Sequence, residues 1–236
     1  MDNNSIASHQ QEPHIHKTGK KLNRLRAAVL GANDGIISVA SIVVGVAGAS
    51  NSPRFIFTAG IAGLVAGSLS MSVGEYVSVS TQRDTEKAFL EKEQLEITNT
   101  PELELEELEL IYEKKGLSKK TAQIVAQELT AHDAFAAHVD AELGINLHDP
   151  INPWVAVLAS ALSFLCGAIV PLLLITFSPT AIRIPITFVG VFVALAITGL
   201  LSARTGGTNK TIATARIVIG GMLAMLVTFG VGKLFG

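Results

Sequence analysis

Residues 55–97 read FIFTAGIAGLVAGSLSMSVGEYVSVSTQRDTEKAFLEKEQLEI, and this segment changes from apolar to charged without a break. Its first half, to about Ser80, is apolar over the roughly 20 residues that an α-helix needs to cross a bilayer. Its second half is rich in Glu and Lys, and neither Pro nor Gly interrupts the chain between Glu75 and Ile97. We therefore predict one long helix that leaves the membrane and ends near Ile97.

Charged residues are concentrated in one part of the chain. Only 3 of the 38 Asp, Glu, Lys and Arg lie in residues 27–80 and 5 in residues 150–236, whereas 23 lie in residues 81–149. They make up 16% of the chain, against about 25% in an ordinary soluble domain. The net charge of −2 argues against a nucleic-acid partner, and a single cysteine excludes a disulfide scaffold. This pattern predicts a membrane protein with a polar insert.

Five membrane-spanning helices are predicted from the apolar segments, each of which has the length of one span. Short turns rich in Asn, Ser, Pro or Gly separate neighbouring spans. The five segments cover residues 26–49, 55–80, 153–176, 182–201 and 212–234.

The predicted fold class is therefore all-α: a polytopic membrane protein with five transmembrane helices and a cytoplasmic three-helix insert between spans two and three. The domain organisation expected from this reading is a disordered cytoplasmic tail at 1–25, spans one and two at 26–80, the helical insert at 81–150, and spans three to five at 151–236.

The orientation follows from Lys and Arg in short loops, which favour the cytoplasmic side. Most of them precede span one or lie around the turn between spans four and five, while the opposite side carries only Arg54, Arg183 and Lys233. The N-terminus and the insert are thus predicted to be cytoplasmic, and the C-terminus to lie outside or in a lumen.

The insert is predicted to contain two helices after the long one. Pro101 suits the first turn of a helix over residues 102–115. Ser118 suits the N-cap of a third helix, which Gly144 closes as a C-cap residue.

Two carboxylates interrupt the first two spans. Asp34 lies about 12 Å into span one at 1.5 Å per residue, and Glu75 lies near the cytoplasmic end of span two. An ionisable group in hydrocarbon is costly and usually faces a cavity or the bundle interior. Met71, one turn before Glu75, offers a softer thioether ligand. The alternative is that Met71 is a core residue and that Glu75 reaches water at the interface.

Small residues recur at helical spacing in the same two spans. Gly31 and Gly35 are four residues apart, as are Gly63 and Gly67. Such faces allow close helix packing in lipid, so a tight bundle or a dimer is expected.

The insert is acidic, with 16 Asp and Glu against 7 Lys and Arg over residues 81–149. Helical spacing places three pairs of candidate metal ligands on shared faces: Glu93 with Glu96, Glu104 with Glu107, and His138 with Glu142. Three packed helices would bring these faces into an oxygen-rich site with one imidazole, which suits Fe²⁺, Mn²⁺, Co²⁺ or Zn²⁺. The alternative is a solvated charged face.

Three motifs resemble the vacuolar iron transporter family. They are Asn33-Asp34-Gly35-Ile36 in span one, Ser68-Leu69-Ser70-Met71-Ser72-Val73-Gly74-Glu75-Tyr76 in span two, and Gln82-Arg83-Asp84-Thr85-Glu86 just after it. With the Glu-rich insert and three further spans, the resemblance covers nearly the whole chain after residue 20. It indicates the branch of the family that carries a cytoplasmic metal-binding domain.

The resemblance implies a homodimer in the bilayer that moves Fe²⁺, or another divalent ion such as Mn²⁺, out of the cytosol in exchange for protons. It implies a translocation path lined by Asp34 and Met71, with Glu75 in the same motif. The family's carboxylate ligands for metal capture match the following positions: Glu93, Glu96, Glu104, Glu107 and Glu142. The family's Met pair falls at His138 and Val139, so His138 would supply nitrogen in place of sulfur.

Two other functions stay open from the sequence: a membrane-bound metal sensor or storage protein, and a membrane-anchored ferroxidase. A di-iron ferroxidase would use Glu-x-x-His motifs, but Glu128 and His132 are four residues apart rather than three. We therefore expect no enzyme, and no tightly bound cofactor besides the transported metal. The compact length favours a bacterial inner membrane, with a vacuolar membrane as the alternative.

Overall fold

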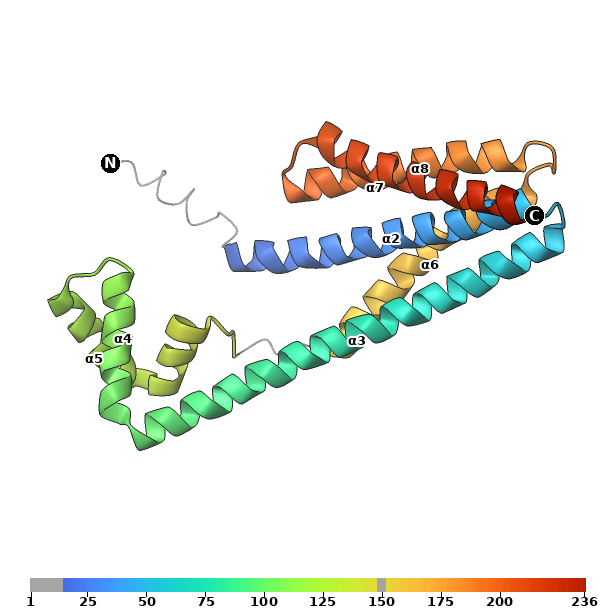
Figure 1. Ribbon diagram of the computed structural model, residues 1–236. Coiled ribbons are helices and arrows are strands. Elements are labelled where there is room, and N and C mark those ends of the chain that lie inside the picture. Colours follow the sequence, from blue (N-terminus) through green and yellow to red (C-terminus); the bar gives the residue numbers. More distant parts are fainter. Residues whose placement is uncertain (1–14, 148–151) are drawn as a thin grey trace. The chain divides into compact units, whose positions relative to one another are not determined.

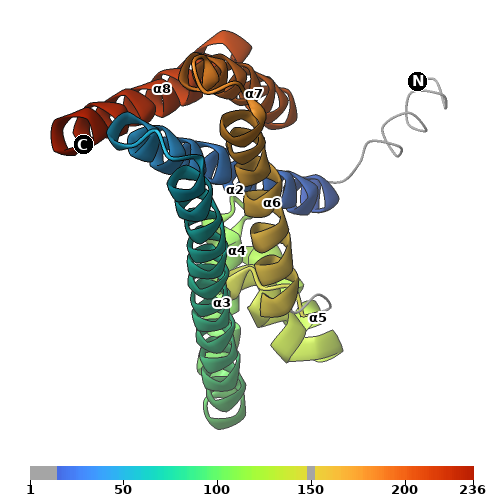
Figure 2. The same ribbon diagram turned by 90° about the vertical axis from the view of Figure 1, so that its right-hand side faces the viewer.

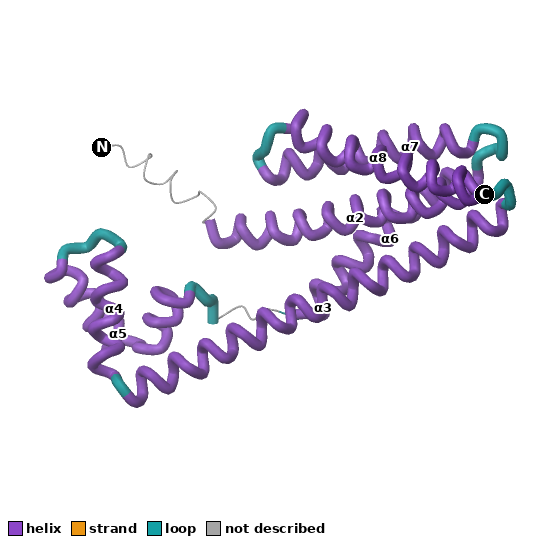
Figure 3. Tube along the Cα trace, in the orientation of Figure 1, coloured by secondary structure: helices purple, strands orange, loops and turns teal. Residues whose placement is uncertain are grey.

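The computed structural model describes residues 15–147 and 152–236, which are helical apart from short connections (Figure 1). The helices are α2 (Ile15–Ala49), α3 (Pro53–Asn99), α4 (Pro101–Lys114), α5 (Lys119–His138), the short π-helix η1 (Val139–Leu143), α6 (Pro153–Phe177), α7 (Arg183–Gly206) and α8 (Lys210–Phe235). Figure 3 shows helices and loops but no strand in the described part of the chain. The predicted all-α class is confirmed.

The chain forms two compact units. The membrane unit comprises the described residues of Met1–Glu75 and Trp154–Gly236, and the insert unit those of Tyr76–Pro153. Helix α3 contributes to both, as its unbroken sequence predicts.

Five helices are long and apolar enough to cross a membrane, which confirms the predicted number of spans. They are Ala28–Ala49 of α2 and Arg183–Arg204 of α7, together with α3, α6 and α8. Large apolar side chains such as Val189, Phe192 and Leu226 are exposed on these helices, as suits surfaces that contact lipid. The protein is therefore an integral membrane protein.

Helix α2 begins at Ile15, well before the Arg26 expected as the start of span one. The helical structure corrects the prediction of a disordered tail for residues 15–25, while residues 1–14 lie outside the described residues. Lys, Leu and Arg are good helix formers, and extending an existing helix is much easier than starting one.

Helix α2 occupies the centre of the membrane unit, where it packs against α7 and α8 (Figure 1). One face of α2 supplies much of the buried core at the spacing of helical turns: Ile36, Val39, Ala40, Val43, Val44 and Ala47. Phe164 of α6 and Leu195 of α7 complete this core from the neighbouring helices.

Helices α2 and α6 cross with their backbones in contact (Figure 2). A Cβ atom at Gly35 would lie 2.1 Å from the carbonyl oxygen of Phe164, and one at Gly167 would lie 2.0 Å from that of Ala32. These distances confirm the close packing predicted from Gly31 and Gly35, because only hydrogen fits at the crossing.

We expect Gly167→Ala to destabilise the membrane unit by about 1–3 kcal/mol, since the added methyl group must push two backbones apart. The control is Gly220→Ala in α8, because a Cβ atom there meets nothing within 4 Å. Thermal unfolding of the purified protein in detergent measures both variants. A melting temperature unchanged by Gly167→Ala would contradict the crossing.

In the insert unit, α4 and α5 pack around a small apolar core. The predicted caps are confirmed: the Thr121 N–H donates to Ser118 Oγ at 3.3 Å, and Gly144 ends η1 with a φ of 62°. The third helix departs from the expected uninterrupted run to Leu143. It is kinked at Asp133, whose Oδ1 accepts a hydrogen bond from the Ala136 N–H at 2.9 Å and so caps the turn that follows.

Candidate metal centre

Three buried side chains from three helices meet inside the insert unit. Glu93 comes from α3, Glu104 from the first turn of α4, and His138 from the end of α5. One ligand atom of each lies within 4.8 Å of the others. His138 Nδ1 is 3.0 Å from Glu93 Oε1 and 3.6 Å from Glu104 Oε2. We call this group the Glu–Glu–His cluster.

These polar side chains point into the insert unit because each lies on a helix face, or next to a residue, that is buried and apolar. Glu104 lies one helical turn before Leu108, which is completely buried. Val139, next to His138, is buried as well. As a result, Glu93, Glu104 and His138 are only 3%, 8% and 1% exposed.

Two atoms of the cluster face each other at the distance of a hydrogen bond. Glu93 Oε1 and His138 Nδ1 are both buried and 3.0 Å apart, and neither has another hydrogen-bond partner, so a proton on one of them joins the pair in the absence of metal. A metal ion bound by both atoms would take the place of that proton. Two ligands at right angles and at about 2.1 Å from a metal lie about 3.0 Å apart, which matches the observed separation.

The electrostatics of the metal-free cluster favour protonated carboxyl groups. Burial, followed by the charges of Glu142 and Glu104, raises the pKa of Glu93 to about 7. Burial, followed by the charge of Glu107, also raises the pKa of Glu104. Burial lowers the pKa of His138, so its imidazole is neutral at physiological pH and can act as a ligand.

The other three candidate ligands lie around the cluster, and the Glu142 side chain is hydrogen-bonded to Glu93. Glu96 is half-buried and forms an ion pair with Lys92 at 2.9 Å, while Glu107 and Glu142 are exposed. All three carboxylates contribute to the raised pKa of Glu104, so they surround the cluster with negative charge. The structure thus buries three of the six candidate residues of the insert together and places Glu142 in contact with one of them.

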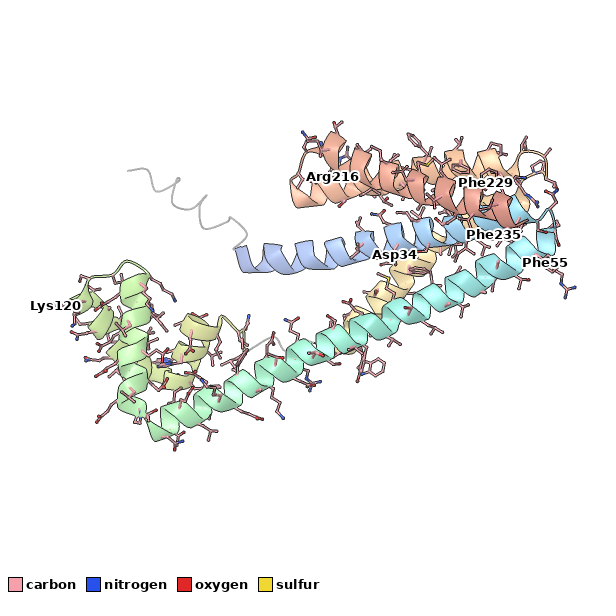
Figure 4. The ribbon with its side chains drawn as sticks, viewed as in Figure 1. Asp34, Phe55, Lys120, Arg216, Phe229 and Phe235 are labelled. Carbon is pink, nitrogen blue, oxygen red and sulfur yellow. The ribbon has the colours of Figure 1, made fainter. Side chains whose placement is uncertain are left out.

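The in-span candidates lie in the membrane unit. Asp34 is exposed on α2, where its Oδ1 accepts a hydrogen bond from the Ser38 hydroxyl at 3.1 Å (Figure 4). Met71 is half-buried against the core, and its Cε lies 3.4 Å from the position of a Cβ atom at Gly31, one turn before Asp34. Glu75 is half-buried one turn further along α3.

Comparison with known proteins identifies the family. The profile of the VIT family matches residues 25–233. The chain belongs to the VIT family. It is 45% identical over 211 residues to the vacuolar iron transporter of Acanthamoeba castellanii, an alignment that covers 89% of this chain and 78% of that protein.

Two plant relatives of this VIT chain match it over similar lengths. Vacuolar iron transporter homolog 1 of Oryza sativa subsp. japonica is 38% identical over 213 residues, covering 90% of this chain and 74% of that protein. Vacuolar iron transporter homolog 2 of Arabidopsis thaliana is 37% identical over 218 residues, covering 92% and 87%.

The structure of this VIT chain also contains polar contacts that cannot be predicted from its sequence pattern. The Thr198 hydroxyl of α7 donates to Asn33 Oδ1 of α2, beside Asp34. Arg183, counted above only as a loop charge, is buried. Asn33, a polar residue inside an apolar span, is the sequence signal for its hydrogen bond with Thr198. The sequence does not identify that partner, which is 165 residues away along the chain.

Metal binding to the Glu–Glu–His cluster is expected to weaken as the pH falls from 8 to 6. A ligand carboxyl group must lose its proton, and the raised pKa of Glu93, about 7, means that protons compete throughout this range. Below pH 7 the affinity should fall by about tenfold per pH unit for each competing proton. Titration calorimetry with Mn²⁺ at several pH values measures this slope, and a pH-independent affinity would contradict the assignment of Glu93.

Proposed function

We propose that this chain exports Fe²⁺ from the cytosol in exchange for protons, as a homodimer in the membrane. The observation that carries the proposal is Asp34, a carboxylate in the first half of a predominantly apolar span. Membership of the VIT family and the names of its relatives support iron as the cargo.

The exposure of Asp34 supports the homodimer. A carboxylate directed at lipid is costly, and such groups usually face a bundle interior or a water-filled cavity. In the single chain Asp34 is exposed, and only 17% of the most apolar stretch of α3 is buried. A second copy packed on this side would enclose Asp34 and Met71 in a shared path.

In the proposed mechanism, the Glu–Glu–His cluster captures the metal and the carboxylates around it raise the local cation concentration. The ion then passes to Glu75 and Met71 and on to Asp34. Because carboxylates bind metal only when deprotonated, metal entry releases protons and protons from the far side displace the metal. The metal is the cargo, and no resident cofactor or enzymatic step is part of this proposal.

The distribution of Lys and Arg supports a cytoplasmic N-terminus and insert unit and a C-terminus on the far side. The ligand set of the cluster also admits Mn²⁺, Co²⁺ and Zn²⁺. For the membrane we propose a bacterial inner membrane, with a vacuolar membrane, which the names of the relatives suggest, as the alternative.

The test is Fe²⁺ flux into sealed proteoliposomes that contain the purified full-length protein and an internal pH-sensitive dye. We expect metal entry accompanied by proton movement in the opposite direction. Metal binding without flux, under a proton gradient and with Mn²⁺ also tried, would favour a sensor or storage protein. Conversion of Fe²⁺ to Fe³⁺ without transport would favour a ferroxidase.

A further inference from the structure

A buried arginine begins helix α7. Arg183 is 3% exposed, and its Nη2 donates to the carbonyl oxygen of Asn51 at 3.1 Å. Its Nε is buried without a hydrogen-bond partner. Since arginine stays protonated at every physiological pH, a full positive charge and an unsatisfied donor are buried together. Such burial is costly unless an anion pairs with the charge.

The described part of the membrane unit contains no acidic side chain within reach of Arg183. The acidic residues in its two segments, 15–75 and 154–236, are Asp34 and Glu75. At 1.5 Å per residue, Asp34 lies about 22 Å before the end of α2, and Glu75 lies about 33 Å after the start of α3. Asn51, which Arg183 contacts, lies between these two helix ends.

A cavity of about 50 Å³ adjoins the guanidinium group. Its lining includes Arg183 and three hydroxyl-bearing residues, Thr176, Ser178 and Thr180. One water molecule needs about 10–15 Å³, so this cavity has room for one small anion such as a phosphate group.

Two helix N-termini add positive potential at the same place. Pro53, the first residue of α3, lines the cavity, and α7 begins at Arg183 itself. The N-cap residue of α7, Ile182, provides no side-chain cap for the first-turn N–H groups. Pro53 and Pro185 have no N–H group, so the first turns of α3 and α7 contribute mainly through the positive end of the helix dipole, which favours an anion.

We propose that this cavity binds one phosphate group, with the Arg183 guanidinium and the neighbouring hydroxyl groups as donors. Guanidinium geometry matches phosphate oxygens, and hydroxyl groups can complete the coordination. The phosphate comes from a phospholipid headgroup or from inorganic phosphate in solution. The site lies where α6 ends and α3 and α7 begin, so the bound group would hold these helix ends together. This binding is independent of metal transport.

The experiment uses the delipidated full-length protein in detergent. Thermal unfolding is followed with sodium phosphate and with sodium chloride at equal ionic strength, then with phosphatidic acid and with diacylglycerol, which lacks the phosphate. We expect a saturable rise in melting temperature with a phosphate compound only, and one phosphate per chain by native mass spectrometry. A response to inorganic phosphate identifies a soluble ligand, and a response to phosphatidic acid alone identifies a lipid headgroup.

Variants link this binding to Arg183. Arg183→Gln should weaken phosphate binding by about ten- to a hundredfold, as expected for a lost charge-assisted hydrogen bond. Arg54→Gln, an exposed arginine close to the start of α3, is the matched control and should bind normally. If Arg183→Gln does not fold, Thr176→Val tests the site by removing one hydroxyl group at nearly constant volume. Equal stabilisation by chloride, equal loss in Arg54→Gln, or no binding of either phosphate compound would overturn the proposal.

Discussion

Asp34→Asn is expected to reduce Fe²⁺ flux in proteoliposomes by about a hundredfold or more. A divalent cation inside an apolar span needs a negatively charged ligand beside it, because the low-dielectric surroundings do little to stabilise the charge of the cation. Asparagine keeps the size of the side chain and an oxygen that can accept the hydrogen bond from Ser38. The fold should therefore survive while the charge is lost.

Two measurements separate a blocked path from a damaged protein. Metal binding at the Glu–Glu–His cluster should be unchanged in Asp34→Asn, because Asp34 and the cluster belong to different compact units. Ser38→Ala, which removes only the hydrogen bond to Asp34, should retain most of the flux. Wild-type flux in Asp34→Asn would refute the assignment of Asp34 to the transport path.

Much of the fold could be predicted because it depends on local sequence. The apolar segments give the five spans, and the absence of a breaker after Glu75 gives the continuation of α3 to Asn99. The caps at Ser118 and Gly144 follow from side-chain and backbone chemistry at single positions. The kink at Asp133 could not be predicted in the same way. An Asp in a helix usually points to solvent, and only the tertiary fold makes it a cap here.

The candidate site was only partly accessible from sequence. Helical spacing assigns Glu93 and Glu96 to one face, but it does not say how deeply each is buried. In the structure Glu93 faces His138, while Glu96 is half-buried and pairs with Lys92. The difference in burial between Glu93 and Glu96 depends on which turn of α3 contacts the other helices. That contact is part of the tertiary structure, so helical spacing does not predict it.

The burial of Arg183 is a second property that the sequence does not predict. In the sequence it is one of three positive charges near a membrane face, alike in type to Arg54. Burial and the contact with Asn51 distinguish it, and the partner in that contact is 132 residues away along the chain.

His138→Ala is expected to weaken metal binding to the insert unit by about a hundredfold. Loss of a second-shell partner alone costs about ten- to a hundredfold in metal affinity, so loss of a direct ligand should reach or exceed the upper value. His132→Ala is the matched control, because His132 lies on the same helix but is exposed. Titration calorimetry with Mn²⁺ and Co²⁺ measures both variants, and equal affinities in wild type and His138→Ala would exclude His138 as a ligand.

The same substitution separates capture from translocation. If the cluster only delivers metal to the membrane path, His138→Ala should raise the metal concentration needed for half-maximal flux and leave the maximal flux unchanged. His138→Met places the family's sulfur ligand at this position and should shift the relative affinity away from Mn²⁺ and towards softer ions, because a thioether is a softer donor than imidazole. A fall in maximal flux in His138→Ala, with Asp34 intact, would instead mean that the cluster takes part in the translocation step itself.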